Sequence, residues 1–234
     1  MKTNEKQHIC ADCAVNDSNI FKYLTDSEKE TLDQQKHCNI YRKGDIIYHE
    51  KNRISGCYCV VSGIIKIYKT GIDGKEQIID FAKKGNIIGF RSVLSNEPAC
   101  TSTKVIEDCA VCFIPSSLIF QFIQNNPSFS LNLLKLICKE LETANSYITD
   151  IAQKTVRERL AEILLKLNRE FGVNNEGFIQ INLSREELAN MVGTATESVI
   201  RLLSEFKNEK LIELQTKKIK LIELQKLKAL AKSI

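Results

Sequence analysis

The stretch that decides the fold is Leu183-Ser-Arg-Glu-Glu-Leu-Ala-Asn-Met-Val-Gly-Thr-Ala-Thr-Glu-Ser-Val-Ile-Arg-Leu-Leu-Ser-Glu-Phe206. Ser184 is followed three residues later by Glu187, which is the capping-box pattern at the start of a helix. Thr194 and Glu197 repeat that pattern, and Gly193 can adopt the positive φ of a sharp turn. The sequence therefore predicts two short helices joined by a tight turn.

The apolar residues of this stretch recur at helical spacing and predict an inward face shared by the two helices. They are Leu188, Val192, Val199, Leu202, Leu203 and Phe206, with the small Ala189 where the helices approach each other. Glu197, Ser198 and Arg201 then point outward from the second helix, which we predict over residues 195–207. Two consecutive capping boxes around a turn glycine favour a helix-turn-helix over an ordinary helical hairpin. The second helix of that motif enters the DNA major groove.

A β-hairpin is predicted after the second helix. Its strands are Leu211–Leu214 and Ile219–Ile222, joined by the turn Gln215-Thr-Lys-Lys218. A hairpin in this place is a wing, and the lysine pair at its tip can contact the phosphate backbone. The residues predicted to contact DNA are Arg185, Thr194, Thr196, Glu197, Ser198, Arg201, Lys217 and Lys218.

Positive charge is concentrated in the part of the chain that carries this motif. Residues 154–234 hold 15 Lys/Arg and 11 Asp/Glu, whereas residues 1–153 hold 18 of each. The whole net charge of +4 belongs to the C-terminal segment, which fits phosphate contact, although a solvated basic face gives the same count. No apolar run is long enough to span a bilayer, and the polar start has no signal-peptide core. We expect a cytoplasmic protein with no membrane partner.

Residues 38–115 predict a β-rich domain, preceded by a short helical lead-in over residues 19–37 that is capped at Thr25–Glu28. Asp73-Gly74 is a hairpin signal, and further glycines punctuate short β-rich segments. These segments are Ile46–Tyr48, Cys57–Val61, Ile64–Tyr68, Gln77–Phe81, Ile87-Ile88 and Ala110–Ile114. Many short strands at this spacing predict a small barrel or jelly roll.

A long helix is predicted over residues 127–153, because one set of small and apolar residues is spaced alternately three and four apart. The set is Leu134, Ile137, Leu141, Ala144, Ile148 and Ile151. A seam this regular usually faces a partner helix, so we expect a parallel homodimer, although Leu133 and Leu136 would pack within their own domain. The expected α+β protein thus has a sensor β-roll at 1–126, a dimerisation helix at 127–153 and a winged helix-turn-helix at 154–234.

Nine cysteines in a cytoplasmic chain are expected to be thiols or metal ligands rather than disulfides. Cys10-x-x-Cys13 together with Cys109-x-x-Cys112 has the spacing of a four-cysteine zinc site. Residues three apart on a strand face opposite sides, however, so Cys109 and Cys112 could not both reach one ion, which disfavours zinc. The sequence shows no phosphate-binding glycine loop, catalytic triad or histidine ligand pair, so we do not expect an enzyme.

The order of β-roll, long helix and winged helix-turn-helix resembles the Crp/Fnr superfamily of homodimeric bacterial transcription regulators. The likeness is sharpest in the glycine pattern of the roll, in Val156–Ala161 and in Thr196–Arg201. It implies a roll that resembles the cyclic nucleotide-binding domain, a near-palindromic DNA operator and contact with RNA polymerase. It also implies that Glu197 and Arg201 read base edges, which suits side chains that bind cytosine and guanine. Ile200 stands where some members carry a serine for another base contact.

The same resemblance argues against cyclic AMP as the effector. Members that bind it carry a glutamate where this chain has Phe90, and an Arg-Ser pair where it has Ala99-Cys100. Without that arginine, a buried phosphate would lack its partner charge.

The oxygen-sensing branch of the superfamily holds a [4Fe–4S] cluster, for which four thiolates are the usual ligands. Cys10, Cys13 and Cys112 match three of the branch's ligand positions, and the remaining position falls on Asn19. Asp17 or Cys38 is then the candidate for the last ligand. Haem, a redox thiol switch and the loss of any effector stay open, as does a redox or small-molecule binding module that does not act on DNA.

Overall fold

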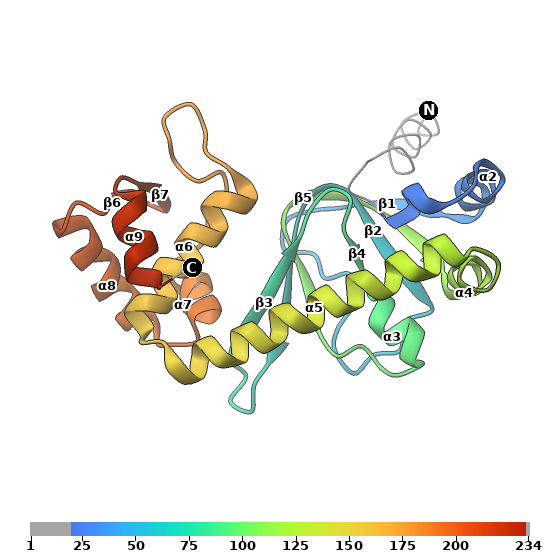
Figure 1. Ribbon diagram of the computed structural model, residues 1–234, viewed down its shortest axis with the longest axis horizontal. Coiled ribbons are helices and arrows are strands. Elements are labelled where there is room, and N and C mark those ends of the chain that lie inside the picture. Colours follow the sequence, from blue (N-terminus) through green and yellow to red (C-terminus); the bar gives the residue numbers. More distant parts are fainter. Residues whose placement is uncertain (1–19, 233–234) are drawn as a thin grey trace. The chain divides into compact units, whose positions relative to one another are not determined.

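The computed structural model describes residues 20–232 of the chain, which divides into two compact units after Leu141. Figure 1 shows the N-terminal unit as a β-roll with helices packed on it, and the C-terminal unit as a group of helices with a small hairpin. No helix among the described residues is both long and apolar enough to cross a membrane. The predicted α+β fold, with a roll, a long helix and a winged helix-turn-helix, is confirmed.

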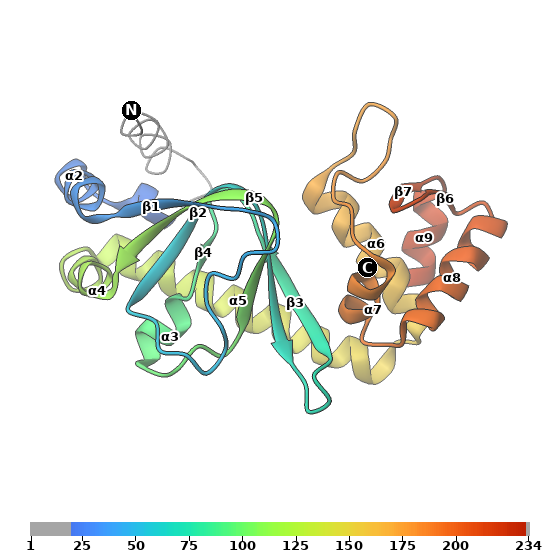
Figure 2. The same cartoon turned by 180° about the vertical axis from the view of Figure 1, so that it is seen from behind.

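The N-terminal unit is built on an antiparallel sheet. Its strands are β1 (His37–Tyr41), β2 (Gly56–Thr70), β3 (Glu76–Ala82), β4 (Ile87–Ile88) and β5 (Ser102–Pro115). The hydrogen-bonded order is β1-β5-β2-β3, and β4 pairs with β2 (Figure 2). The pairing between β2 and β5 shifts register three times near Ser62 and Ile64, as expected of β-bulges that bend a long strand. Gly63 has a φ of +84° at this bend and leaves no room for a Cβ beside the Asp108 carbonyl.

Three strand predictions for this unit need correction. The two predicted segments of residues 57–61 and 64–68 are parts of one bent strand, β2. Residues 46–48 form no strand. Ile46 makes an isolated bridge to Lys104, and Tyr48 is hydrogen-bonded to Thr103 of β5. Strand β1 begins at His37, the last residue of the predicted lead-in, and its other residues lie in the predicted β-rich region, where no segment was expected before Ile46. Its pattern of half-buried and exposed residues gives no alternating apolar signal.

Helices cover one face of this sheet. They are η1 (Ile20–Tyr23), α2 (Asp26–Gln35), α3 (Phe90–Ser95), α4 (Ser116–Asn125) and the first part of α5 (Pro127–Gln153). The predicted cap of α2 is confirmed, because the Thr25 hydroxyl accepts from the Glu28 N–H while the Glu28 carboxylate accepts from the Thr25 N–H. The long helix α5 has the bounds expected from the sequence.

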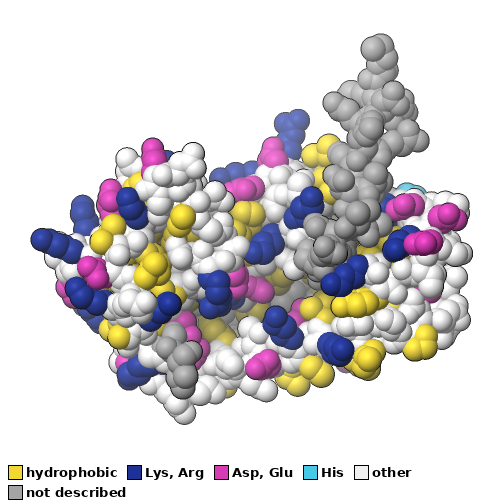
Figure 3. Space-filling model, turned by 45° about the horizontal axis from the view of Figure 1, so that its top comes forward, with side chains coloured by type: hydrophobic (Ala, Val, Ile, Leu, Met, Phe, Trp, Pro, Cys, Tyr) yellow, Lys and Arg dark blue, Asp and Glu magenta, His cyan; other side chains and the backbone are white. Residues whose placement is uncertain are grey.

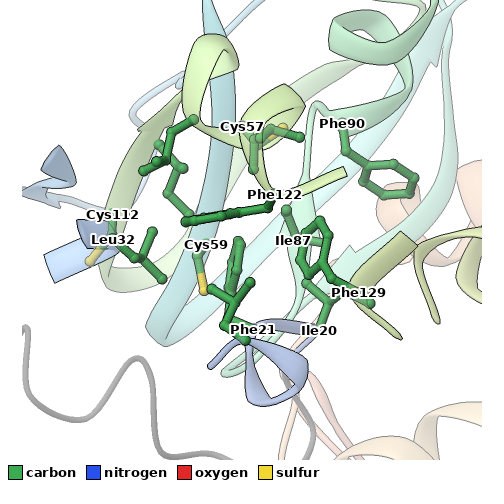
Figure 4. Packing of buried hydrophobic residues seen from close by; sticks show 14 of the residues in the cluster. Ile20, Phe21, Leu32, Cys57, Cys59, Ile87, Phe90, Cys112, Phe122 and Phe129 are labelled. Atoms are coloured by element: carbon green, nitrogen blue, oxygen red, sulfur yellow. The ribbon is translucent and has the colours of Figure 1, made fainter. Parts of the chain in front are cut away.

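The two faces of the sheet carry separate apolar clusters. Toward the helices, aromatic rings of η1, α4 and α5 meet cysteine side chains of the sheet; Phe21, Phe122, Phe129, Cys59 and Cys112 are labelled in Figure 4. On the opposite face, a second cluster includes Val60, Val111 and Cys109. Neighbouring residues on one strand therefore enter different clusters, as the period of two for a strand requires.

The C-terminal unit holds four helices and a two-stranded hairpin among its described residues, besides the end of α5. They are α6 (Val156–Phe171), α7 (Arg185–Val192), α8 (Thr196–Asn208), β6 (Ile212–Gln215), β7 (Lys218–Leu221) and α9 (Leu224–Ala231). Helix α6 begins with a capping box of its own, formed by Thr155 and Glu158. The wing hairpin is confirmed, with each strand shifted by one residue toward the turn.

Candidate nucleic-acid interface

The helix-turn-helix consists of α7 and α8 joined at Gly193, whose φ of +72° is left-handed. The Ser184 hydroxyl accepts from the Glu187 N–H and the Glu187 carboxylate accepts from the Ser184 N–H, so the first predicted capping box is confirmed. The predicted inward face is confirmed as well, since every one of its members is at most 4% exposed. These members are Leu188, Ala189, Val192, Val199, Leu202, Leu203 and Phe206.

The second predicted capping box is wrong. The N-cap of α8 is Ala195, whose side chain has no hydrogen-bond acceptor, and the helix begins at Thr196. Thr194 belongs to the turn, because its N–H donates to the carbonyl of Ala189 at 3.1 Å. Glu197 is thus the second residue of the helix rather than the third, so it cannot close a box with Thr194.

Residues 157–159, on the first turn of α6, fix the positions of neighbouring helix ends. The Arg157 guanidinium binds Glu205 of α8 and Glu209, the residue directly after that helix. Glu158 completes the α6 cap and pairs with Lys232. Arg159 donates to the carbonyl of Val192 at the last residue of α7 and to that of Lys154 after α5.

Through these contacts, residues within 156–161 connect the start of α6 to the ends of the helices around it. Neither Arg157 nor Arg159 was assigned a role from the sequence alone. The sequence did offer one sign of such a role. The two arginines are two residues apart on a strongly amphipathic helix, so their side chains point in different directions and can contact different neighbours.

The exposed face of α8 carries an acid, an apolar side chain and a base close together. Glu197 is exposed, Ile200 is 49% exposed and the side chain of Arg201 is 67% exposed. A spacing of four places Glu197 and Arg201 on one side of the helix. The Arg201 guanidinium donates to Glu205 one turn further on, with Nη1 2.6 Å from Oε1. Thr196 and Ser198 are half-buried at the start of the same helix.

The wing places its two predicted lysines differently. Lys217 is exposed in the turn, whereas Lys218 is the first residue of β7 and is half-buried, with Nζ 5.9 Å from the centre of the Phe178 ring. Only one lysine therefore lies at the tip, because the turn itself comprises Thr216 and Lys217.

Arg185 connects the first helix of the motif to the wing. Its Nη2 donates to the carbonyl of Thr216 at 2.9 Å, while its Nη1 is buried and has no hydrogen-bond partner among the described residues. Burial lowers the pKa of Arg185 from its usual value. This arginine is therefore partly withdrawn from the surface.

Basic side chains do not form one uninterrupted patch on the face shown in Figure 3. Lys and Arg, in dark blue, are interspersed there with Asp and Glu, in magenta. The net charge of +4 by itself is thus only a weak indication that DNA is the partner. The stronger indication is the geometry of α8 and the wing.

Most of the predicted seam of α5 is open on its outer side. Leu134 is 58% exposed, Leu141 60%, Ile148 65% and Ile151 45%. Ala144 is exposed too, whereas Ile137 is half-buried against the apolar cluster of the N-terminal unit. The helix buries Phe129 and Leu133 in the apolar cluster of the N-terminal unit instead. Most seam residues therefore lie on a different side of the helix from the one that packs on this cluster.

The cysteines of the roll correct one expectation from the sequence. Cys38 of β1 and Cys112 of β5 face each other across the strand pair and form a disulfide, because direct cross-strand partners have adjacent Cβ atoms. Cys10, Cys13 and Asp17 lie outside the described residues. Burial raises the pKa of the Cys57 thiol to about 12 and that of Cys109 to about 11, so both are neutral thiols at ordinary pH.

The positions that the resemblance assigns to a cyclic nucleotide carry no charge. Phe90 is 3% exposed and packs into the cluster beneath the helices, and Ala99 is 3% exposed in the other cluster. Arg91 is exposed, and Cys100 is half-buried. No guanidinium thus stands where the phosphate would need one.

Comparison with known proteins agrees with this architecture. Residues 39–126 match the family described as the cyclic nucleotide-binding domain, and residues 158–230 match the Crp-like helix-turn-helix domain. The chain is 26% identical over 229 residues to the transcriptional activator protein anr of Pseudomonas aeruginosa, covering 96% of this chain and 93% of that protein.

Two further relatives point the same way. The chain is 26% identical to the fumarate and nitrate reduction regulatory protein of Vibrio cholerae, covering 95% of this chain and 90% of that one. The structure of FixK2 from Bradyrhizobium japonicum is similar with a TM-score of 0.75 at 26% identity, over 83% of this chain and 96% of that chain. The chain is a member of the Crp/Fnr family of DNA-binding transcription regulators.

Proposed function

We propose that the protein acts as a homodimer on a near-palindromic operator, with α8 of each protomer in a major groove. The observation that carries the proposal is the exposed set of Glu197, Ile200 and Arg201 on a helix whose opposite face is buried. Arginine can donate two hydrogen bonds to guanine, and glutamate accepts from cytosine. An isoleucine between them suits a thymine methyl group, which apolar side chains contact.

The remaining contacts proposed for this interface go to the DNA backbone. Lys217 is exposed at the wing tip, and Arg185 approaches the same turn. Thr194, Thr196, Ser198 and Lys218 are half-buried around the motif, with hydroxyl or ammonium groups that suit phosphate oxygens. Such a regulator would work in the cytoplasm, where family members also contact RNA polymerase.

The seam of α5 supports a second copy of the chain as the partner. Apolar residues at the spacing of an a/d seam and mostly exposed are expected to pair with the same residues of an identical helix. Two recognition helices about 34 Å apart would then meet successive turns of the same DNA face. Leu141→Asp places a charge in this seam and should yield monomers in analytical ultracentrifugation. Ile72→Asp, at a fully exposed turn, is the matched control and should leave the dimer intact.

Base recognition can be tested by selection from a random duplex pool with the wild-type chain. We expect an enriched, near-palindromic sequence that outcompetes random DNA. Arg201→Ala should then lose about 5- to 150-fold of the discrimination at one base pair of each half-site, as one arginine–guanine pair supplies. Lys207→Ala, an exposed base at the end of α8, should lose none. A wild-type protein that enriches no sequence would contradict sequence-specific binding.

The described residues do not fit a [4Fe–4S] cluster. Cys112 and Cys38 supply two sulfurs, but these are bonded to each other, and Cys112 is fully buried. Among residues 20–232, no three His, Cys, Asp or Glu side chains are placed to hold a metal ion. The cluster remains a prediction that depends on residues before Ile20.

The disulfide favours a thiol switch as the input of this regulator. Two thiols at Cys38 and Cys112 would lose two protons and two electrons to a small disulfide, which leaves as two thiols. Cys38→Ser should make DNA binding insensitive to the ratio of oxidised to reduced glutathione, whereas Cys138→Ser, at an exposed free thiol, should not. Iron and sulfide analysis of anaerobically purified protein separates this switch from the cluster. About four irons per chain would favour the cluster instead.

A further inference from the structure

The side chain that should read guanine is held in a chain of ion pairs that leads back into the protein. Glu205 lies one helical turn after Arg201 and uses both carboxylate oxygens. Its Oε1 is 2.6 Å from Nη1 of Arg201, and its Oε2 is 3.0 Å from Nη1 of Arg157. A carboxylate held on both sides cannot swing away from Arg201 without losing Arg157.

Arg157 is also anchored by one group in the last turns of α8 and one directly after the helix. Its Nη2 lies 2.6 and 2.7 Å from the two carboxylate oxygens of Glu209, and its guanidinium carbon lies 4.8 Å from the centre of the Phe206 ring. Phe206 is fully buried, whereas the side chain of Arg201 is 67% exposed. Arg157 and Glu205 therefore link the buried Phe206 ring to the exposed Arg201 side chain through successive contacts.

We propose that Glu205 is a positioning residue for DNA recognition, which orients the Arg201 guanidinium, and that Arg157 holds Glu205 in place. This inference rests on the proposed role of Arg201. An exposed arginine on its own samples many rotamers, and ordering it on DNA costs conformational entropy. A carboxylate that engages Nη1 from one side restricts the guanidinium plane and leaves Nε and Nη2 free for a base edge. Side chains that recognise a ligand are accurate when neighbouring hydrogen bonds fix their rotamers.

The alternative role for Glu205 is that of a competitor, which occupies Arg201 until DNA displaces it. The second ion pair with Arg157 favours positioning, because Arg157 satisfies the carboxylate from the side away from Arg201. The two roles predict opposite signs. A competitor weakens operator binding, so its removal strengthens it, whereas a positioning residue strengthens specific binding only.

The test compares full-length variants on the operator enriched by the wild-type chain, on its single-base variants and on random duplex. Glu205→Gln keeps the shape of the side chain but removes the charge that holds both arginines. Operator affinity should fall by about fivefold, the lower end of what one arginine–guanine pair supplies. The loss should be confined to the base pair that Arg201→Ala relaxes. Affinity for random DNA should not fall, since a negative charge near the phosphates is gone.

Two further variants separate positioning from a structural role. Glu186→Gln is the matched control, because Glu186 is an exposed carboxylate of α7 in the same unit and takes no part in the ion pairs of Arg157 and Arg201. It should keep base discrimination even if it lowers the melting temperature. Arg157→Gln should relax the same base pair as Glu205→Gln, and adding it to Glu205→Gln should cause no further loss of discrimination.

Each other outcome overturns the inference. Stronger operator binding by Glu205→Gln, with discrimination kept, would make Glu205 a competitor. An equal fall in affinity for operator and for random DNA would show that Glu205 has only a structural role. If Glu205→Gln does not fold, Arg157→Gln provides the second measurement. If Arg201→Ala relaxes no base pair, the proposed role of Arg201 fails first and this inference fails with it.

Discussion

The two units of this chain are specified over different distances along the sequence. In the β-roll, Cys112 of β5 lies opposite Cys38 of β1 on one side and opposite Cys59 of β2 on the other. The strand order of this sheet therefore depends on residues far apart in the chain. In the winged helix unit, the starts of α6 and α7 are fixed by residues three apart, such as Ser184 with Glu187. Local contacts need little loop closure before they form, whereas paired distant strands need much. The DNA-binding role of the winged helix unit can therefore be inferred from local motifs, whereas the effector of the β-roll cannot.

The largest expected effect tests whether each unit depends on its own core. Phe206 of α8 and Phe129 of α5 are both fully buried, each in a different unit. Phe206→Ala and Phe129→Ala should each lower the free energy of unfolding by about 3–5 kcal/mol, through lost contacts and the cavity left behind. Hydrogen exchange followed by mass spectrometry should show faster exchange in residues 156–231 for the first variant and in the strands of the roll for the second.

That experiment is its own control, because each variant reports on the other's unit. We expect Phe206→Ala to abolish operator binding and Phe129→Ala to leave the amides of α7 and α8 protected. Equal loss of protection across the whole chain, from either substitution, would show that the units unfold together and would break the comparison.

The sequence predicted the local parts of the structure best. The inward faces of α7 and α8, the bounds of α5 and the caps at Thr25 and Ser184 follow from spacing within a few residues. The strand β1 and the single bent strand β2 did not, since edge exposure and bulges depend on partners elsewhere. The disulfide was missed because a cytoplasmic chain was expected to carry thiols, and only the strand register places Cys38 opposite Cys112.

In the candidate site, the exposed residues were predicted and their supports were not. Glu197 and Arg201 are recognised by type and spacing. Arg157 and Glu205 contact each other across almost fifty positions, and nothing in either local sequence indicates that pairing. The second capping box failed for a related reason. The turn after Gly193 displaces the helix start by one residue, which spacing alone cannot reveal.

A pH measurement sharpens the comparison on the side of the winged helix unit. A hydrogen bond from Lys232, together with those from Thr155, lowers the pKa of Glu158 from 4.5 to about 2. Because the folded-state pKa is depressed, this carboxylate stabilises the fold fully above its unfolded value near 4.5, and the contribution is lost as the pH falls toward about 2. In urea titrations followed by circular dichroism, Glu158→Gln should reduce the acid sensitivity of the helical signal. Glu186→Gln, which removes an exposed charge on α7, should reduce it less.

The smallest expected effect concerns the start of α8, whose N-cap residue forms no side-chain hydrogen bond. Ala195 has the extended backbone of a good N-cap, with φ −76° and ψ 149°, close to the −68° and 163° of Ser184. Ser184→Ala should cost about 1 kcal/mol of unfolding free energy, since a hydrogen bond to the Glu187 N–H is lost. Ala195→Ser should add about 0.5 to 1 kcal/mol, because its hydroxyl can accept from the N–H of Ser198. Paired urea titrations measure both.

Opposite signs at these two positions would show that the helix starts of this unit are governed by side chains within three residues. The gain at position 195 should also be independent of the loss at 184, because the two caps share no hydrogen bond and their energies should add in the double variant. A loss at 195 would mean that the turn after Gly193, rather than the cap, fixes where the recognition helix begins. In that case the orientation of α8 would depend on its long-range supports, with Arg157 foremost, and the winged helix unit would be less local than its sequence suggests.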